Sequence, residues 1–272
     1  MLELFRYRPH QEDLAAFLEF LNQHTLIGGD GWVLLMAVAA SICIGLSKAG
    51  LAGTATLNVV LMAQAFGAKP SVGLVLPLLI AADLMGFWVN RGAGTWRQVW
   101  KIAPAAMLGV ILGWVLLGRI DNHAARPIIG WVIVGLLIFH LLITTKAQAT
   151  AFLSGHQGFS WVMGLIAGVV TMLANAAGPV MTVYLLAQHL PKREHLGVFS
   201  RYFLFLNLFK VPFSADLGII NSRSLLTNAV LLPAAVLGVI LGWQILRRIP
   251  QKPFEWTLFV LTFLAALWMV AA

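Results

Sequence analysis

One lysine stands in the middle of a long apolar run, in the stretch Gly45-Leu-Ser-Lys-Ala-Gly-Leu-Ala-Gly53. A lysine surrounded by hydrocarbon is costly unless it faces protein, water or a ligand. The neighbouring glycines let the backbone leave the helix and expose N–H groups. An anion held between helix ends and a lysine is the simplest reason to combine these features. The stretch therefore predicts one half of an anion site, carried by Ser47, Lys48, Gly50 and Gly53.

Three more charged residues lie deep in apolar segments: Asp83, Arg201 and Lys210. At 100° per residue, Ser200 and Asn207 share one helix face, and Lys210 lies about 60° from Asn207. We expect this face to turn toward the site. Arg201 stays a candidate, although nine residues of separation place it opposite Lys210. Asp83 has two open interpretations, neutralisation of a buried lysine or coupling to protons.

The composition indicates an integral membrane protein. Of 272 residues, 60% are hydrophobic and only 10% are charged, against roughly 25% charged residues in soluble domains. The net charge of +8 does not predict nucleic-acid binding, because the basic residues lie between apolar runs, as in cytoplasmic loops. The single cysteine excludes a disulfide within the chain. The seven histidines are scattered, so no metal site is predicted.

Apolar segments divide the chain into two similar halves. In each half, two short segments precede three longer ones, which predicts an all-α polytopic protein whose short segments are re-entrant or broken helices. A polar stretch from Lys146 to Gln157 separates the halves. The segments are 32–47, 51–66, 71–90, 98–118 and 127–145, followed by 159–173, 179–190, 196–217, 224–246 and 254–272.

The two halves are an internal repeat. Residues 104–120 and 233–249 share the core LGVILGW and are identical at thirteen of 17 positions, with an offset of 129. Upstream the offset is 124, which aligns Gly73 with Gly197 and Asp83 with Asn207. The same offset aligns residues 50–54 with 174–178, so Asn175 and Gly178 form the second half of the predicted site. It also aligns Gln64 with Gln188. The glycines of LGVILGW are interpreted as helix-packing contacts.

Each half crosses the membrane an odd number of times, whether its short pair is a hairpin or two spans. The halves therefore insert with opposite orientation, an arrangement typical of secondary transporters whose site lies at the repeat interface. Lysines and arginines in loops number nine on one side and six on the other, which predicts outward-facing termini. We expect an amphipathic interfacial helix within 1–30, a first repeat at 31–146 and a second at 157–272.

The sequence resembles the TauE/SafE family of sulfite exporters at Gly45-Leu-Ser-Lys-Ala-Gly, Pro77-Leu-Leu and Asp83. The resemblance extends over about residues 30–272 and includes Arg91, Trp96, Arg97, Gly178-Pro179, Arg201, Asn207 and Lys210. It implies export of sulfite or a related organosulfonate across the bacterial inner membrane.

The expected function is thus alternating-access transport of a small sulfur-containing anion through an inverted repeat. No cofactor and no nucleic acid is expected; the partners are the anion and the lipid bilayer, and a homodimer is left open. An anion-selective channel is the alternative. An intramembrane enzyme is disfavoured because H-E-x-x-H, G-x-S-x-G and a second deep carboxylate are missing from the sequence. The candidate substrate-binding residues are Ser47, Lys48, Gly50, Gly53, Gln64, Asn175, Gly178, Gln188, Ser200, Arg201, Asn207 and Lys210, with Asp83 as the coupling or charge-balancing group.

Overall fold

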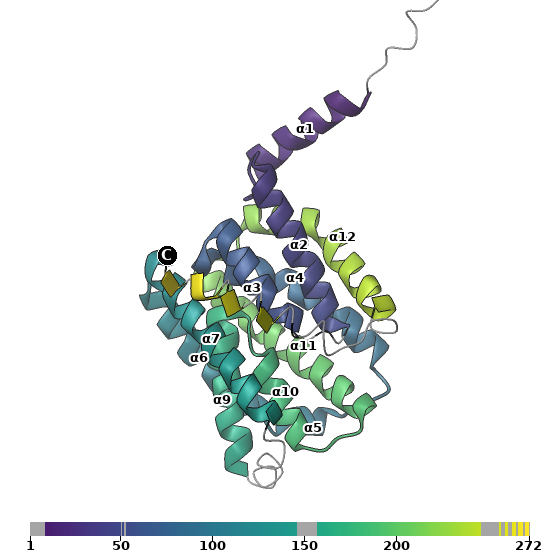
Figure 1. The fold of residues 1–272 in the computed structure, drawn as a ribbon, viewed down its shortest axis with the longest axis vertical. Coiled ribbons are helices and arrows are strands. Elements are labelled where there is room, and N and C mark those ends of the chain that lie inside the picture. The colour runs from purple at the N-terminus through teal and green to yellow at the C-terminus, as the bar shows by residue number, and fades with distance from the viewer. Residues whose placement is uncertain are drawn as a thin grey trace, which may run out of the picture.

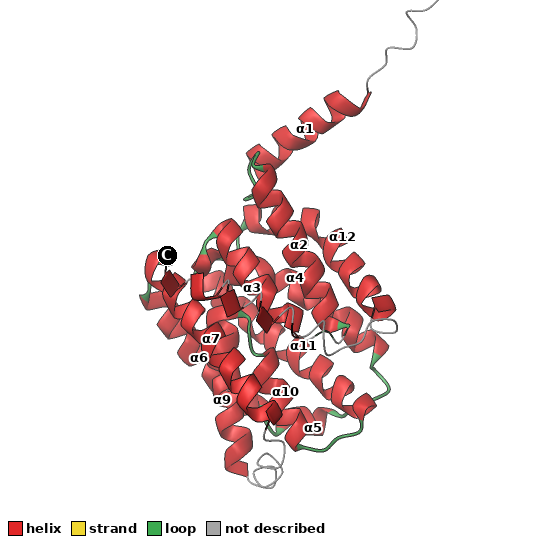
Figure 2. Cartoon of the chain, viewed as in Figure 1, coloured by secondary structure: helices red, strands yellow, loops and turns green. Residues whose placement is uncertain are grey.

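The computed structural model describes residues 9–49, 51, 53–145, 157–245 and parts of 256–271. Throughout the described residues the regular structure is helical (Figure 2). Most of the predicted last segment, 254–272, and all of Gly50 lie outside the described residues. The helices are α1 (Pro9–His24), α2 (Gly31–Lys48), α3 (Gly53–Phe66), α4 (Ala68–Val89), α5 (Trp96–Trp100), α6 (Ala103–Arg119), α7 (Asn122–Thr145), α9 (Gln157–Ala174), α10 (Gly178–Ala187), α11 (Lys192–Asp216) and α12 (Ser222–Ile245).

Five described helices, α2, α4, α7, α11 and α12, are long and apolar enough to cross a membrane. Shorter apolar helices α3, α6, α9 and α10 lie beside them. Large apolar side chains such as Trp88, Trp131 and Val162 are more than half exposed, which suits a surface covered by lipid rather than water. The chain is therefore a multi-pass, all-helical membrane protein, as its composition predicts.

Both predicted breaks are present. α2 ends at Lys48 and α3 begins at Gly53. In the second half α9 ends at Ala174 and α10 begins at Gly178. Asn175, the first residue after α9, has φ 52°, a left-handed conformation that asparagine tolerates better than most residues.

The predicted segment 98–118 differs from the structure, because it is divided between α5 and α6. Thr95 and Gln98 form a capping box that starts α5. Pro104 lies in the first turn of α6, where its missing N–H costs nothing. Its repeat counterpart Pro233 lies inside the continuous helix α12, so the two halves are not identical here.

Helices of one half pack closely against helices of the other (Figure 1). α6 crosses α9 at Gly109 and Gly168, and a Cβ added to Gly168 would lie 2.8 Å from the Cα of Gly109. α12 crosses α2 in the same way, since a Cβ on Gly45 would lie 2.6 Å from the carbonyl carbon of Gly238. Gly109 and Gly238 are the first glycines of the two LGVILGW copies. These glycines are helix-packing contacts, as interpreted from the sequence.

The repeat-related helices α4 and α11 run antiparallel at the centre of the bundle. A Cβ on Gly73, early in α4, would lie 2.4 Å from the carbonyl oxygen of Ile219, which follows α11. Near the other end of α4, a Cβ on Gly86 would lie 3.4 Å from the hydroxyl oxygen of Ser200, in the first half of α11. Antiparallel counterparts are what an inverted repeat requires.

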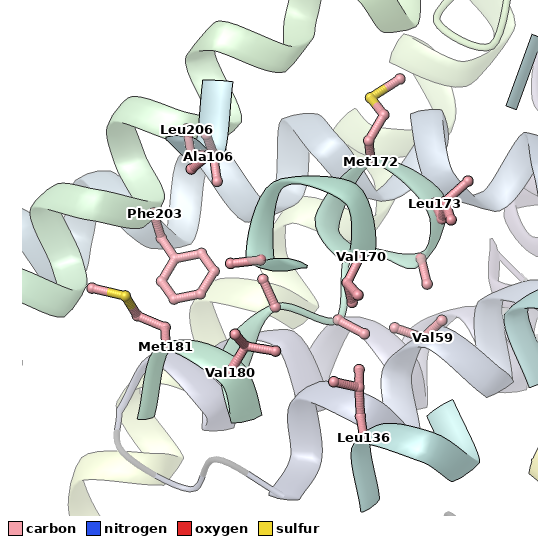
Figure 3. Close-up of a cluster of buried hydrophobic side chains, with 14 of the residues drawn as sticks. Val59, Ala106, Leu136, Val170, Met172, Leu173, Val180, Met181, Phe203 and Leu206 are labelled. Atoms are coloured by element: carbon pink, nitrogen blue, oxygen red, sulfur yellow. The ribbon is translucent and has the colours of Figure 1, made fainter. Parts of the chain in front are cut away.

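A large buried cluster joins α3, α6, α7, α9, α10 and α11. Figure 3 shows part of it, with the ring of Phe203 lying beside Met181 and Val180 of α10. The cluster includes Ala174, Ala176 and Ala177, so it packs around the second break, between α9 and α10. Outside this bundle, α1 projects away from the other helices (Figure 1), and its interfacial placement stays a prediction.

Candidate functional site

A buried ion pair connects the first break to the centre of α4. The ammonium Nζ of Lys48 lies 2.6 Å from Oδ1 of Asp83, and the two side chains are 9% and 1% exposed. The second carboxylate oxygen, Oδ2, accepts a hydrogen bond of 2.7 Å from the amide Nδ2 of Asn207. The Lys48 ammonium also lies 4.5 Å from the centre of the Phe203 ring, a favourable cation–π position. Asp83 is therefore the direct charge partner of Lys48.

A second buried lysine lies at the other break. Lys210 is fully buried and donates hydrogen bonds to Thr171 Oγ1 at 3.2 Å and to Oδ1 of Asn175. The Asn175 amide Nδ2 in turn donates to the backbone oxygen of Val72, at 2.8 Å. Lys210 is thus held by the last turn of α9 and by the residue that ends that helix.

A pocket lies between the two breaks. Its cavity volume is about 30 Å³, which holds about two water molecules. Its lining comes from six helices and from the residue after α9: Ser47, Lys48, Ala55, Asn58, Leu79, Thr171, Asn175, Gly178, Phe199, Phe203 and Asn207.

The first turns of α3 and α10 meet at this pocket. Ala55 lies in the first turn of α3, Gly178 begins α10, and both line the pocket. A Cβ added to Gly178 would lie 3.9 Å from the Cβ of Ala55. The first turns of two helices, whose N-terminal ends carry partial positive charge, therefore border the same small volume beside Lys48. Because α2 and α9 also end at this pocket, and helix C-termini carry partial negative charge, the net positive charge that favours an anion comes from the lysines.

Repeat-related residues from the two halves line the same pocket. Ser47 and Thr171 both line it, as do Leu79 and Phe203, and each pair is separated by the repeat offset of 124. Asp83 and Asn207 are also counterparts, and they are hydrogen-bonded to each other. The pocket is therefore formed by counterpart residues of both halves.

Two asparagines on the pocket wall have an unsatisfied oxygen. Asn58 and Asn207 are each 1% exposed, and their Oδ1 atoms have no hydrogen-bond partner among the described residues. Their amide orientations are determined by their nitrogens, because Asn58 Nδ2 donates to Ala55 O at 2.6 Å and Asn207 Nδ2 donates to Asp83. A flip would place oxygen against oxygen in both cases.

Of the sequence-predicted residues, the pocket brings together Ser47, Lys48, Asn175, Gly178 and Asn207. Lys210 is bonded to two pocket residues, and Asp83 to two others. Gly53 begins α3, two residues before Ala55. The remaining predicted residues that the structure describes, Gln64, Gln188, Ser200 and Arg201, are not part of the pocket wall.

Those four residues have other surroundings. Gln64 is exposed, and Gln188 ends α10. Ser200 donates to the backbone oxygen of Leu196. Arg201 donates to the backbone oxygens of the loop after α4 and of its own helix: Arg91 at 2.6 Å, Gly197 at 3.0 Å, Asn90 at 3.4 Å, and Ala93. In the structure Arg201 therefore anchors that loop to α11.

Sequence reasoning missed Asn58, Thr171, Phe199 and Phe203. Two of them carried a usable signal. Asn58 is a polar residue inside an apolar run, and Thr171 is the counterpart of Ser47 at the offset of 124. The phenylalanines look like ordinary core residues in the sequence. Among the described residues, no group of three side chains suited to metal binding occurs.

Comparison with known proteins gives one match. The family model described as Sulfite exporter TauE/SafE matches residues 33–269, which include both breaks and every residue of the pocket. No curated protein and no solved structure matches the chain.

Proposed function

Because the chain belongs to the TauE/SafE sulfite exporter family, a transporter family, we propose that it exports sulfite or a small organosulfonate across the bacterial inner membrane. The observation that carries this proposal is the pocket itself. Lys48 and the first turns of α3 and α10 border one small volume between the two halves, and the buried Lys210 is hydrogen-bonded to two residues of its wall. Such a site compensates an anion for the hydration it loses on entering.

The proposed binding set is smaller than the sequence-based set. Lys48 and Lys210 supply positive charge, and Ser47, Asn58, Thr171, Asn175 and Asn207 supply polar contacts. Asp83 holds the Lys48 ammonium while no anion is bound, and an entering anion competes with the carboxylate for it. For Arg201 we propose a structural role in the loop after α4 instead of substrate contact.

Alternating access follows from two halves, 31–146 and 157–272, with inverted orientation. Three features support this proposal: antiparallel α4 and α11, the reciprocal crossings of α6 with α9 and of α12 with α2, and a pocket lined by residues of both halves. Rocking of one half against the other would open this pocket first to one side and then to the other. The inside-negative membrane potential favours anion exit by about 2.3 kcal/mol per charge per 100 mV.

The positive-inside rule supports a cytoplasmic location for the loop after α4 and for the segment preceding α11, with both termini outside. In this topology Arg91, Arg97, Lys101 and Arg193 face the cytoplasm, whereas Lys69, Arg119 and Arg223 face the periplasm.

The test is sulfite flux into proteoliposomes containing the purified chain or its Lys48→Ala variant. We expect the variant to insert normally and to lose flux by about tenfold to a hundredfold, the size of a lost charge-assisted contact. Lys48→Arg should retain part of the activity. Lys69→Ala is the matched control, because Lys69 lies at the start of α4 and donates to the backbone oxygen of Ile120. Normal flux in Lys48→Ala would contradict the proposal.

A channel lined by the same residues makes a different prediction. A carrier should show flux that saturates with sulfite concentration. In proteoliposomes preloaded with unlabelled sulfite, labelled sulfite added outside should accumulate inside transiently. Absence of counterflow, with flux linear in concentration, would favour the channel.

A further inference from the structure

The pocket has a formal charge of +1. The ammonium groups of Lys48 and Lys210 and the carboxylate of Asp83 are bonded to its wall. α3, α9 and α10 contain no charged residue. The other described charged side chains of α4 and α11 lie near helix ends or bond backbone elsewhere: Lys69, Arg193, Glu194, His195, Arg201 and Asp216. One negative charge on a ligand therefore neutralises the site, whereas two would leave an unpaired charge in a buried environment.

Two residues of the same wall also have buried hydrogen-bond acceptors without a partner among the described residues. The Oδ1 atoms of Asn58 and Asn207 are buried and unpartnered among the described residues. A fully deprotonated oxyanion brings only acceptors, so it would leave both oxygens unsatisfied. A ligand with an O–H or N–H group would satisfy at least one of them, which removes the penalty of an unpaired buried acceptor.

From these two independent observations we infer that the site selects a monovalent anion that carries a hydrogen-bond donor. Resting on the proposed function, this inference assigns hydrogensulfite, rather than the sulfite dianion, as the transported species. The acidic hydrogen would be donated to Oδ1 of Asn58, and the remaining oxygens would accept from Lys48 and the first turns of α3 and α10. No proton needs to leave or join the protein during the cycle.

Three tetrahedral anions of similar size distinguish the effect of ligand charge on binding from the effect of a hydrogen-bond donor. Sulfate has two charges and no donor, methanesulfonate has one charge and no donor, and sulfamate has one charge and an amino donor. We expect sulfamate to inhibit uptake of radiolabelled sulfite into proteoliposomes best, with methanesulfonate intermediate and sulfate weakest. Each step should be about tenfold, the size of one hydrogen bond or one buried charge contact.

A variant tests which side chain accepts the hydrogen bond from the ligand. Asn58→Leu should remove the advantage of sulfamate over methanesulfonate. Asn228→Leu is the matched control, since Asn228 is also buried and unpartnered among the described residues but is not on the pocket wall. It should keep the advantage. If Asn58→Leu fails to fold, wild-type flux under an imposed potential gives a second measurement, with one charge expected per sulfur atom moved.

Three results would overturn the inference while leaving the proposed function intact, provided that sulfite flux depends on Lys48. The first is inhibition by sulfate as strong as by methanesulfonate, and the second is movement of two charges per sulfur atom. The third is inhibition by sulfamate no stronger than by methanesulfonate. Flux that does not depend on Lys48 would instead overturn the proposed function.

Discussion

At the residue scale, the Lys48–Asp83 pair decides how the site is charged. A buried ion pair adds little net stability, because the cost of removing both groups from water offsets much of their attraction. The pair instead allows a charged lysine to stay buried at the site before an anion binds. Lys48 has the Asp83 carboxylate and the Phe203 ring as partners, and an entering anion would replace the carboxylate. Removal of one partner is costly, since it leaves the other charge unpaired.

Replacement of Asp83 by asparagine tests this role. Asp83→Asn raises the formal charge of the pocket from +1 to +2. We therefore expect the inhibitory potency of sulfate, relative to that of methanesulfonate, to increase by about tenfold. The purified variant should also be less stable without ligand, by about 3 kcal/mol, and should regain stability when sulfate is added. Thermal unfolding with and without sulfate measures both effects. An unchanged order of inhibition would show that Asp83 does not set the charge preference.

At the element scale, contacts between glycines set the distance between the halves. α6 and α9 approach through Gly109 and Gly168, and α12 and α2 through Gly238 and Gly45. A methyl group at such a crossing must push two backbones apart, because backbone atoms cannot move aside as a flexible side chain can. The two crossings involve both halves, so a change at either should affect the whole bundle.

Gly168→Ala should therefore destabilise the protein by about 1–3 kcal/mol, since its Cβ would meet the backbone oxygen of Ala106 at 2.1 Å. Gly135→Ala is the control within α7, where an added Cβ has no described heavy atom within 4 Å. That change should be neutral or stabilising by about 0.5–1 kcal/mol. Thermal unfolding of the detergent-purified variants gives the comparison, and equal stability of the two would contradict it.

The loop after α4 is also an element-scale feature. Arg201→Gln removes most of the bonds to the backbone oxygens of this loop. We expect lower stability and lower maximal flux with an unchanged KM for sulfite, because the pocket is not touched. Lys48→Arg serves as the contrast, since it should change KM. A raised KM with normal stability in Arg201→Gln would instead place the guanidinium on the substrate path.

At the scale of the whole molecule, the proposed orientation of the first half in the membrane has a direct test. In a Cys43→Ser background, a cysteine at Gly29, before α2, should react with an impermeant maleimide added outside. A cysteine at Gly92, in the loop after α4, should react only after the membrane is opened. Both glycines have space, with nothing closer than 4.0 Å to an added Cβ. Labelling of both from the same side would overturn the topology.

Much of this architecture could be predicted from local features of the chain. The offsets of 124 and 129 identified counterparts that do contact each other or occupy equivalent crossings, and the positions of Lys48 and Asn175 identified both breaks. These features persist in the folded chain because packing and backbone freedom depend on residue size and type.

The position of a residue along the helix axis, relative to the pocket, could not be predicted in the same way. Ser200 shares a face with Asn207, but seven residues of helix separate them by about 10 Å, and Ser200 lies beside the loop after α4. Arg201 illustrates a second limit, because the carbonyl oxygens that accept from it belong to a loop without a recognisable pattern. Asn58 and Phe203 join the pocket only because α3 and α11 converge there.

The contact between Asp83 and Asn207 also bears on how such a protein could arise. In an assembly of two identical halves, this position would bring two copies of the same side chain together, and two carboxylates would repel each other. Once joined in one polypeptide, the copies can diverge independently. An uneven number of charges at the centre thus becomes available once the two copies can differ, and with it a preference for ligands that an exactly twofold ancestor could not have had.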